Sequence, residues 1–142
     1  HQGDGTASIL ATQADIFTCS LHGERNFPFR KQTSDLDIAL PDDTADEAYL
    51  AALDTALDHV FGVFRPELVI YLAGADPYRG DRLGRLSLSI EGLASRDEKV
   101  LARCGTASVP VAVAMAGGYA HEIDDTVSIH VGTVLTAARL FA

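Results

Sequence analysis

The order of strand-like and helix-like segments predicts an α/β fold: a parallel sheet with helices on both faces, in three α-β-α layers. Two continuous apolar runs, 68–73 and 109–115, are typical of strands buried on both faces of a parallel sheet. Amphipathic helix patterns follow these runs along the chain, and this alternation is typical of βαβ units. The 142 residues show no repeat and no change of composition, which predicts a single domain.

The amino-terminal part is expected to contain a strand, a long loop and a helix. Residues 15–21 are rich in β-branched and aromatic side chains, which predicts a strand. Residues 22–43 are polar and rich in Pro, Gly and Asp, which predicts a long loop, and such loops in compact domains are usually functional. Thr44 and Glu47 form a capping-box pattern that predicts the start of a helix, and Pro66 predicts its end. Its apolar stripe consists of Tyr49, Leu53, Leu57, Val60 and Phe64.

The remaining chain is expected to contain two strands and two helices in alternation. The strand over 68–73 ends in a Gly-Ala-Asp-Pro turn, and a loop follows it. A second capping-box pattern at Ser95 predicts a helix that ends at Gly105. The run 109–115 predicts the next strand, and a last helix is expected over 121–140. One face of that helix is apolar and consists of Ile123, Val127, Val131, Val134 and Ala138.

Composition and charge exclude several classes of partner. The chain has 11 Lys and Arg residues against 20 Asp and Glu residues, a formal net charge of −9. A nucleic-acid surface needs a basic stripe, so no nucleic acid is expected to bind. No apolar run approaches the roughly 20 residues that span a bilayer, so no membrane partner is expected. Cys19 and Cys104 cannot form a disulfide framework, which predicts free thiols in a reducing compartment and a cytoplasmic location.

Polar residues gather where the predicted strands end. Ser20 and His22 lie at the end of the first strand, Asp76 follows the second, and residues 117–119 follow the third. The carboxyl ends of parallel strands meet at one edge of a sheet, and ligands of open α/β sheets bind there. The sequence therefore predicts a ligand site at this edge.

Spacing alone leaves the chemistry of this edge open. His1 and Asp76 carry the nitrogen and oxygen ligands that suit zinc, but a catalytic zinc generally takes three protein ligands, and an Asp after a strand is often a turn former. The hydroxyl of Tyr119 could donate a hydrogen bond to a developing oxyanion, or the side chain could simply pack at a loop. Neither a glycine-rich nucleotide motif nor a GxSxG hydrolase elbow is present.

Three motifs taken together resemble a known family. They are HQGDGT at residues 1–6, GADPYRGDRLG at 74–84 and AGGY at 116–119. Their types, order and separation resemble the carboxyl-terminal half of zinc-dependent histone deacetylases of the arginase/deacetylase fold, most closely the class IV and bacterial deacetylase-like branch. The resemblance covers essentially the whole chain and implies that residues 1–142 are the C-terminal portion of a single deacetylase-like domain.

The resemblance implies roles for particular residues. His1 matches the histidine ligand of zinc, and Asp76 matches the second aspartate ligand. Tyr119 matches the tyrosine that polarises the amide carbonyl and stabilises the tetrahedral oxyanion. Ser20 and Leu21, with the backbone of His1, match the inner site for a monovalent cation, normally K⁺. The implied reaction is the zinc-dependent hydrolysis of acyl-lysine, in which a histidine takes the proton of the attacking water.

The resemblance also implies a substrate tunnel and an incomplete site. Phe27 and Leu83 match walls of the acyl-lysine tunnel, and Gly118 fits beside its floor. The family's first aspartate ligand lies two residues before His1, and its paired histidines, including the general base, lie further upstream; none of them is in this chain. We therefore expect the 142 residues alone to be inactive, and either to self-associate through an exposed sheet edge or to be poorly soluble.

Three alternatives remain beside acyl-lysine hydrolysis. The substrate could be a small acetylated amine or polyamine, or the chain could be a non-catalytic α/β module that binds a partner. An arginase-like site with two manganese ions is disfavoured, because Pro77 and Tyr78 follow Asp76 where arginases carry a further metal-binding aspartate pattern.

Overall fold

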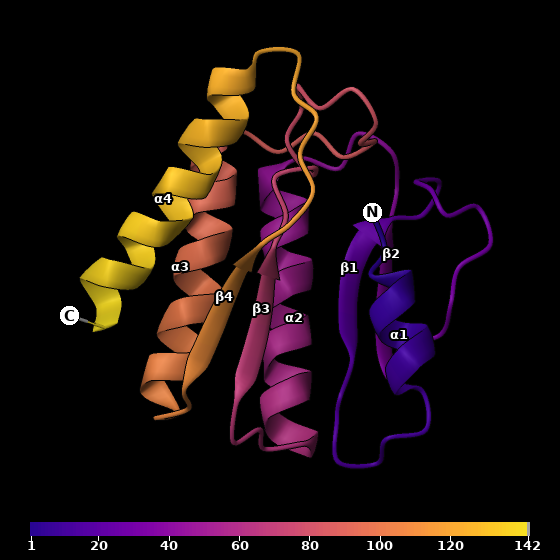
Figure 1. Ribbon diagram of the computed structural model, residues 1–142, viewed down its shortest axis with the longest axis vertical. Helices are drawn as coiled ribbons and strands as arrows, with labels where there is room; N and C mark the ends of the chain where they lie inside the picture. Colours follow the sequence, from indigo (N-terminus) through magenta and orange to yellow (C-terminus); the bar gives the residue numbers. More distant parts are fainter. Residues whose placement is uncertain (142) are drawn as a thin grey trace.

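A computed structural model describes residues 1–141, and Figure 1 shows its helices and strands in chain order. The elements are α1 (Asp4–Leu10), β1 (Cys19–Gly23), β2 (Leu36–Leu40), α2 (Asp46–Val63), β3 (Val69–Ala73), α3 (Ile90–Thr106), β4 (Val111–Met115) and α4 (Ile123–Phe141). Among residues 1–141, no helix is long and apolar enough to cross a membrane.

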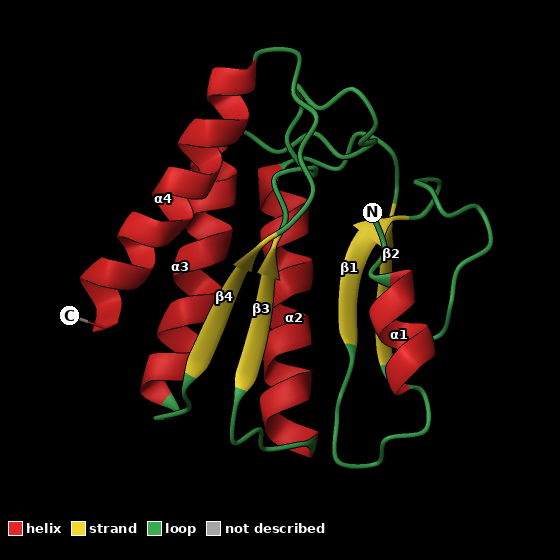
Figure 2. Ribbon diagram, in the orientation of Figure 1, coloured by secondary structure: helices red, strands yellow, loops and turns green. Residues whose placement is uncertain are grey.

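The strands form two parallel pairs. β1 pairs with β2, with Leu21 opposite Ile38, and β3 pairs with β4, with Tyr71 opposite Val113. Figure 2 shows all four strands pointing toward the same end, where the long loops and the N-terminus gather. Helices α2 and α3 lie behind the strands, and α1 lies in front of β2. The predicted α/β class with parallel strands is confirmed.

Burial of β3 and β4 differs from the prediction. Ile70 is 68 % exposed, and Leu72 and Met115 also have exposed side chains, whereas Ala73 is fully buried. The helices cover one face of this strand pair, and no described element covers the other. The apolar runs therefore predicted the strands correctly, but burial on both faces is not found within residues 1–141.

Two predicted boundaries near the N-terminus are wrong. The first strand spans Cys19–Gly23, four residues later than its predicted start. The predicted loop over 22–43 contains β2, in which Leu36, Ile38 and Leu40 alternate with more exposed residues. This period of two is the pattern of a strand with one face on the core, but only five residues carry it.

The two helix starts are capped differently from the prediction. The Thr44 hydroxyl donates to the Pro41 carbonyl oxygen (2.7 Å), and α2 has no side-chain cap. Helix α3 begins after Ser89, whose hydroxyl oxygen accepts from the Gly92 N–H (2.9 Å). Ser95 lies inside α3, where its hydroxyl donates to a backbone carbonyl oxygen one turn earlier. Both predicted capping boxes are therefore absent.

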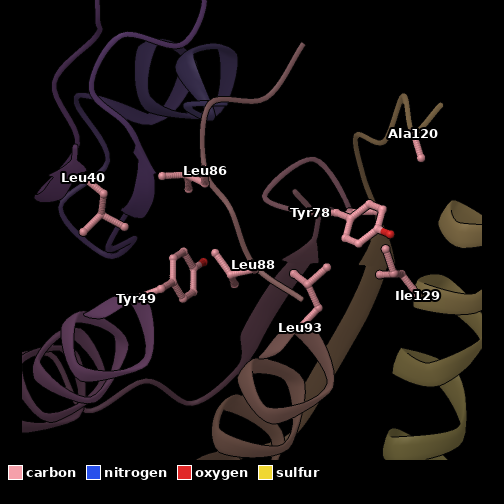
Figure 3. Close-up of a cluster of buried hydrophobic side chains, with 9 residues drawn as sticks. Leu40, Tyr49, Tyr78, Leu86, Leu88, Leu93, Ala120 and Ile129 are labelled. Atoms are coloured by element: carbon pink, nitrogen blue, oxygen red, sulfur yellow. The ribbon is translucent and has the colours of Figure 1, made fainter. Parts of the chain in front are cut away.

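The core is centred on the long loop between β3 and α3. Figure 3 shows that Leu86 and Leu88 of this loop lie between Leu40 and Tyr49 on one side and Leu93 on the other. The buried cluster consists of Leu40, Tyr49, Ala75, Tyr78, Leu86, Leu88, Leu93, Ala120 and Ile129. Side chains of this loop are therefore part of the main hydrophobic core.

Helix α4 packs on α3 through a face that was not predicted. Thr126, Ile129 and Thr133 are buried, whereas the predicted apolar face is largely exposed. The exposed side chains of that face include Ile123, Val127, Val131 and Val134. The Thr133 hydroxyl donates to the buried carboxylate of Asp97 on α3, so the contact between the two helices is partly polar.

The two thiols are free, as predicted. Cys104 is buried in α3, and Cys19 is exposed at the start of β1.

Candidate functional site

His1 and Asp76 meet at the carboxyl edge of the strands, although 75 positions separate them. His1 Nδ1 lies 2.8 Å from Asp76 Oδ2, and the N-terminal ammonium contacts the same oxygen. His1 stands three residues before α1, and Asp76 stands three residues after β3. A nitrogen atom and an oxygen atom of the kinds that bind metal ions therefore face each other in a partly buried position.

Two glycines leave room for the Asp76 carboxylate. A Cβ atom on Gly74 would lie 2.5 Å from Asp76 Oδ1, and one on Gly117 would lie 3.1 Å from the same atom. The Ala75 N–H donates to the Gly117 carbonyl oxygen (2.6 Å), so the loops after β3 and β4 are joined at this point. Any side chain at Gly74 would push the carboxylate out of place.

Tyr119 lies in the second of these loops, and the loop after β3 holds its backbone. Its N–H donates to Asp81 Oδ2 (2.5 Å). Its carbonyl oxygen accepts from the backbone N–H of Arg82 (3.0 Å) and from Arg82 Nε (3.1 Å). The side chain is 54 % exposed, so the phenol is available to a ligand.

A cavity of about 1380 Å³ between the two strand pairs gathers most of the predicted residues. Its lining includes His1, Ser20, Leu21, Phe27, Asp76, Leu83 and Tyr119. Most of the lining surface is apolar, and residues of α1, α2, α3, β1 and β3 all contribute to it. His1, Asp76 and Tyr119 line this cavity near the carboxyl ends of the strands.

Gly118 is not part of this lining. A Cβ atom there would lie 2.9 Å from Thr126 Cγ2 and 3.0 Å from Ala75 Cβ, so the residue packs against α4 and the loop after β3. Phe27 and Leu83, the two predicted tunnel walls, are both exposed at the cavity. The predicted roles of these three residues stay predictions.

The predicted residues of the cation site lie on β1. Ser20 is the second residue of the strand, not at its carboxyl end as predicted, because the strand continues to Gly23. Ser20 Oγ lies 3.0 Å from His22 Nδ1. His22 is almost fully buried, and this burial lowers the pKa of its imidazole below the ordinary value. Whether Ser20 and Leu21 hold K⁺ stays a prediction.

The donors present fit one part of a zinc site. Within residues 1–141, no group of three His, Cys, Asp or Glu side chains is arranged to hold a metal ion. His1 and Asp76 supply two donors of the types that zinc takes, and catalytic zinc sites use three protein ligands. The pair therefore suits zinc in chemistry but is incomplete in number.

A buried polar network beneath the Asp76 loop was not predicted. Arg96 Nη1 donates to the Gly74 carbonyl oxygen (2.6 Å), and Arg96 Nε donates to Asp97 Oδ1 (2.9 Å). The Tyr71 hydroxyl donates to the same carboxylate oxygen. Burial disfavours the charged guanidinium, but Tyr71 and Asp97 outweigh this effect and raise the pKa of Arg96 above its ordinary value. The signal in the sequence is that positions 96 and 97 share the buried face of α3 with Leu93, Val100 and Leu101.

Comparisons with known proteins bear on the identity of this site. The model of the histone deacetylase domain matches residues 1–135. An uncharacterized protein of Picosynechococcus sp. is 46 % identical over 130 residues, which cover 92 % of this chain and 43 % of that protein. Histone deacetylase 2 of Arabidopsis thaliana is 34 % identical over 122 residues, which cover 84 % of this chain and 32 % of that protein.

Solved structures show the same fold. Acetylpolyamine aminohydrolase from Burkholderia pseudomallei matches with a TM-score of 0.80 at 19 % identity, over 99 % of this chain and 43 % of that one. A histone deacetylase homologue from Aquifex aeolicus matches with a TM-score of 0.74 at 23 % identity, over 96 % and 38 %. The chain spans less than half the length of these relatives. Because the domain model matches nearly every residue, the chain belongs to the histone deacetylase family.

Proposed function

We propose that these 142 residues are the C-terminal portion of a single deacetylase-like domain whose parent hydrolyses acyl-lysine with the help of zinc. The observation that carries the proposal is the contact between His1 Nδ1 and Asp76 Oδ2 beside the loop that bears Tyr119. Two metal ligands and an exposed phenol beside one cavity are part of the set of groups that metal-assisted amide hydrolysis needs.

Each group has a defined task in this proposal. A bound zinc ion would polarise the acyl carbonyl and acidify a water molecule. His1 and Asp76 would hold the ion from one side. The Tyr119 hydroxyl would donate a hydrogen bond to the acyl oxygen as it gains negative charge. Leu83 and Phe27 would pack against the aliphatic stem of the lysine, because both are apolar side chains exposed at the cavity.

K⁺ is part of the same proposal. Ser20 and Leu21 line the cavity together with His1, and backbone and hydroxyl oxygens are the ligands that such a cation takes. A K⁺ ion at β1 would bring positive charge beside the zinc ligands. Catalysis in the intact parent should then respond to K⁺ at constant ionic strength.

The isolated chain is proposed to be inactive. Within residues 1–141 only two donors meet, and zinc held by two protein ligands is exchanged readily. Elemental analysis after exhaustive dialysis is expected to find far less than one zinc per chain. An assay with an acetyl-lysine peptide and added Zn²⁺ is expected to show no turnover. Turnover by the isolated chain that Asp76→Asn abolishes would overturn the proposed inactivity.

The hydrolase function can be tested in a chimera. Residues 1–135 would replace the matching part of the Picosynechococcus relative, which supplies the remaining length. We expect this chimera to cleave acetyl-lysine peptides, and Tyr119→Phe to lower kcat by about 100-fold, the usual effect of losing one oxyanion donor. Glu122→Gln is the control, because Glu122 is an exposed acid near Tyr119 outside the cavity lining.

A small acetylated amine is the second candidate substrate. The fold matches that of an acetylpolyamine aminohydrolase, and a net charge of −9 attracts polycations. The same chimera, given an acetylated polyamine and an acetyl-lysine peptide, ranks the two substrates by kcat/KM. A folded, zinc-loaded chimera that cleaves neither substrate would favour the remaining alternative, a non-catalytic module that binds a partner.

Self-association of the isolated chain is also proposed. β1 and β3 each pair with one neighbour, and Ile70 and Leu72 expose apolar side chains beside the cavity. Unpaired edges and apolar faces of this kind promote association. Light scattering at micromolar concentration should find species larger than a monomer, and Ile70→Lys with Leu72→Lys should shift them toward the monomer. A monomeric wild-type chain would contradict this proposal. Cytoplasmic location stays a prediction.

A further inference from the structure

One carboxylate binds the backbone of two separate loops. Asp81 Oδ1 accepts from the N–H groups of Leu83 (2.8 Å) and Gly84 (2.7 Å). Its other oxygen, Oδ2, accepts from the N–H of Tyr119 (2.5 Å), which lies 38 positions further along the chain. Three backbone donors on one side chain make Asp81 a second point, besides the Ala75–Gly117 contact, at which the loop after β3 and the loop after β4 are joined.

The backbone of Tyr119 is held on both of its sides. The Arg82 N–H donates to the Tyr119 carbonyl oxygen (3.0 Å), and the His121 N–H donates to the Gly80 carbonyl oxygen (3.0 Å). Asp81 and Ala120 form an isolated antiparallel bridge. Because the Tyr119 side chain is more than half exposed, neighbouring side chains do not fix its direction, and its position depends on these backbone contacts.

The same turn also touches the loop of Asp76. A Cβ atom on Gly84 would lie 2.2 Å from the Asp76 carbonyl oxygen and 3.3 Å from Asp81 Cβ. The turn that Asp81 closes therefore packs directly against the backbone of Asp76. This contact explains why a glycine stands at 84, since any larger residue would separate the turn from the Asp76 loop.

We propose that Asp81 is a positioning residue that sets Tyr119 and Leu83 relative to Asp76. It does so by fixing the backbone, because its carboxylate accepts from the backbone N–H groups of Leu83, Gly84 and Tyr119. The importance of these positions for catalysis rests on the proposed function. The positioning of Tyr119 and Leu83 does not depend on the proposed function, because it is a property of the three backbone contacts.

The test measures hydrogen exchange of single amides in the 142-residue chain, read by mass spectrometry at low micromolar concentration. Asp81→Ala removes all three acceptor contacts, and the milder Asp81→Asn serves if the alanine variant does not fold. We expect exchange at Leu83, Gly84 and Tyr119 to accelerate roughly tenfold or more, with unchanged protection in β3 and α3. Asp125→Asn is the matched control, because it removes the carboxylate that accepts from the Tyr78 hydroxyl (2.9 Å) and leaves Tyr119 untouched.

Two outcomes would overturn the proposal. Protection at Tyr119 that is the same in wild type and Asp81→Ala would show that the carboxylate does not hold this backbone. A uniform rise of exchange in β3 and α3 would show a general structural role instead of local positioning. In an active chimera, Asp81→Asn should lower kcat by roughly tenfold while zinc content stays the same. A chimera without activity refutes the proposed function and leaves the exchange result valid.

Discussion

Arg96→Met is expected to destabilise the fold strongly, because it leaves a buried carboxylate without its cationic partner. Asp97 is 1 % exposed and Arg96 is 4 % exposed. The carboxylate accepts from Arg96 Nε (2.9 Å) and from the hydroxyls of Tyr71 and Thr133. Burial first, and then the nearby Asp97 charge, raise the pKa of Tyr71 well above its ordinary value, so the phenol stays a neutral donor.

The size of the effect follows from what remains after the substitution. Methionine fills most of the volume of the arginine stem but supplies no charge and no N–H donor. Asp97 would keep two neutral O–H donors, and the Gly74 carbonyl oxygen would lose its 2.6 Å contact with Arg96 Nη1. Breaking a buried pair in this way costs about 3–5 kcal/mol. A domain of this size has a free energy of unfolding of about 5–15 kcal/mol, so a large share is lost.

Urea unfolding at pH 7 measures this loss. With a slope of about 2 kcal/mol per molar urea, the midpoint should fall by roughly 1.5–2.5 M. Lys99→Met on the same helix is the control, because it breaks the exposed pair between Lys99 Nζ and Asp54 Oδ1 (2.8 Å) and should cost less than about 1 kcal/mol. If Arg96→Met costs no more than Lys99→Met, the reasoning about the buried pair is refuted.

Three further predictions concern the core, the glycines and pH. Leu101→Ala should cost about 2–5 kcal/mol in urea unfolding, because Leu101 is fully buried; a cost near zero would contradict its place in the core. Gly132→Ala should stabilise α4 by about 0.5–1 kcal/mol, because no atom lies within 4 Å of the new Cβ. Gly92→Ala should destabilise the fold, because its Cβ would lie 2.0 Å from Asp46 Oδ1. Thermal melts in which both variants shift the melting temperature in the same direction would refute this contrast. Burial lowers the pKa of His22, so below the ordinary value of 6.5 the unfolded chain binds more protons than the folded one. Stability should therefore fall as pH drops below 6.5, and His22→Gln should reduce this slope in urea midpoints measured from pH 8 to 5; an unchanged slope would exclude His22 as its source.

Elements with a long apolar pattern were predictable, and elements whose ends depend on distant residues were not. Helix α2 and strands β3 and β4 carry such patterns and were found close to their predicted ranges. The start of α3 was misplaced because Ser89 lacks a glutamate three residues later, which the capping-box pattern requires. Its cap is instead strengthened by Asp46 of α2, which accepts from the Ser89 N–H (2.8 Å) and hydroxyl (2.6 Å). A contact between residues 43 positions apart leaves no local signal.

The position of the candidate site could be predicted from the sequence, but the contacts between its residues could not. The rule that ligands bind at the carboxyl ends of parallel strands correctly placed the loops of Asp76 and Tyr119 side by side. Residue chemistry offered His1 and Asp76 only as possible zinc ligands, and the resemblance to a family gave each of them a definite role. The three contacts of Asp81 join backbone groups of two loops, and the sequence shows only that an acidic residue stands in a glycine-rich turn.

The apolar face of α4 shows what periodicity can and cannot establish. A repeat of Val127, Val131 and Val134 at three- and four-residue spacing indicates that this face is buried, but it does not identify the neighbour. In the described chain the helix turns Thr126 and Thr133 toward α3 and leaves the valines exposed. A surface helix places its apolar stripe toward the core. A helix that instead packs on one neighbour through partly polar residues and leaves its apolar face exposed is typical of a helix that lies between two neighbours. Within residues 1–141 this apolar face is not covered, and the pattern supports the proposal that the chain is one portion of a larger domain.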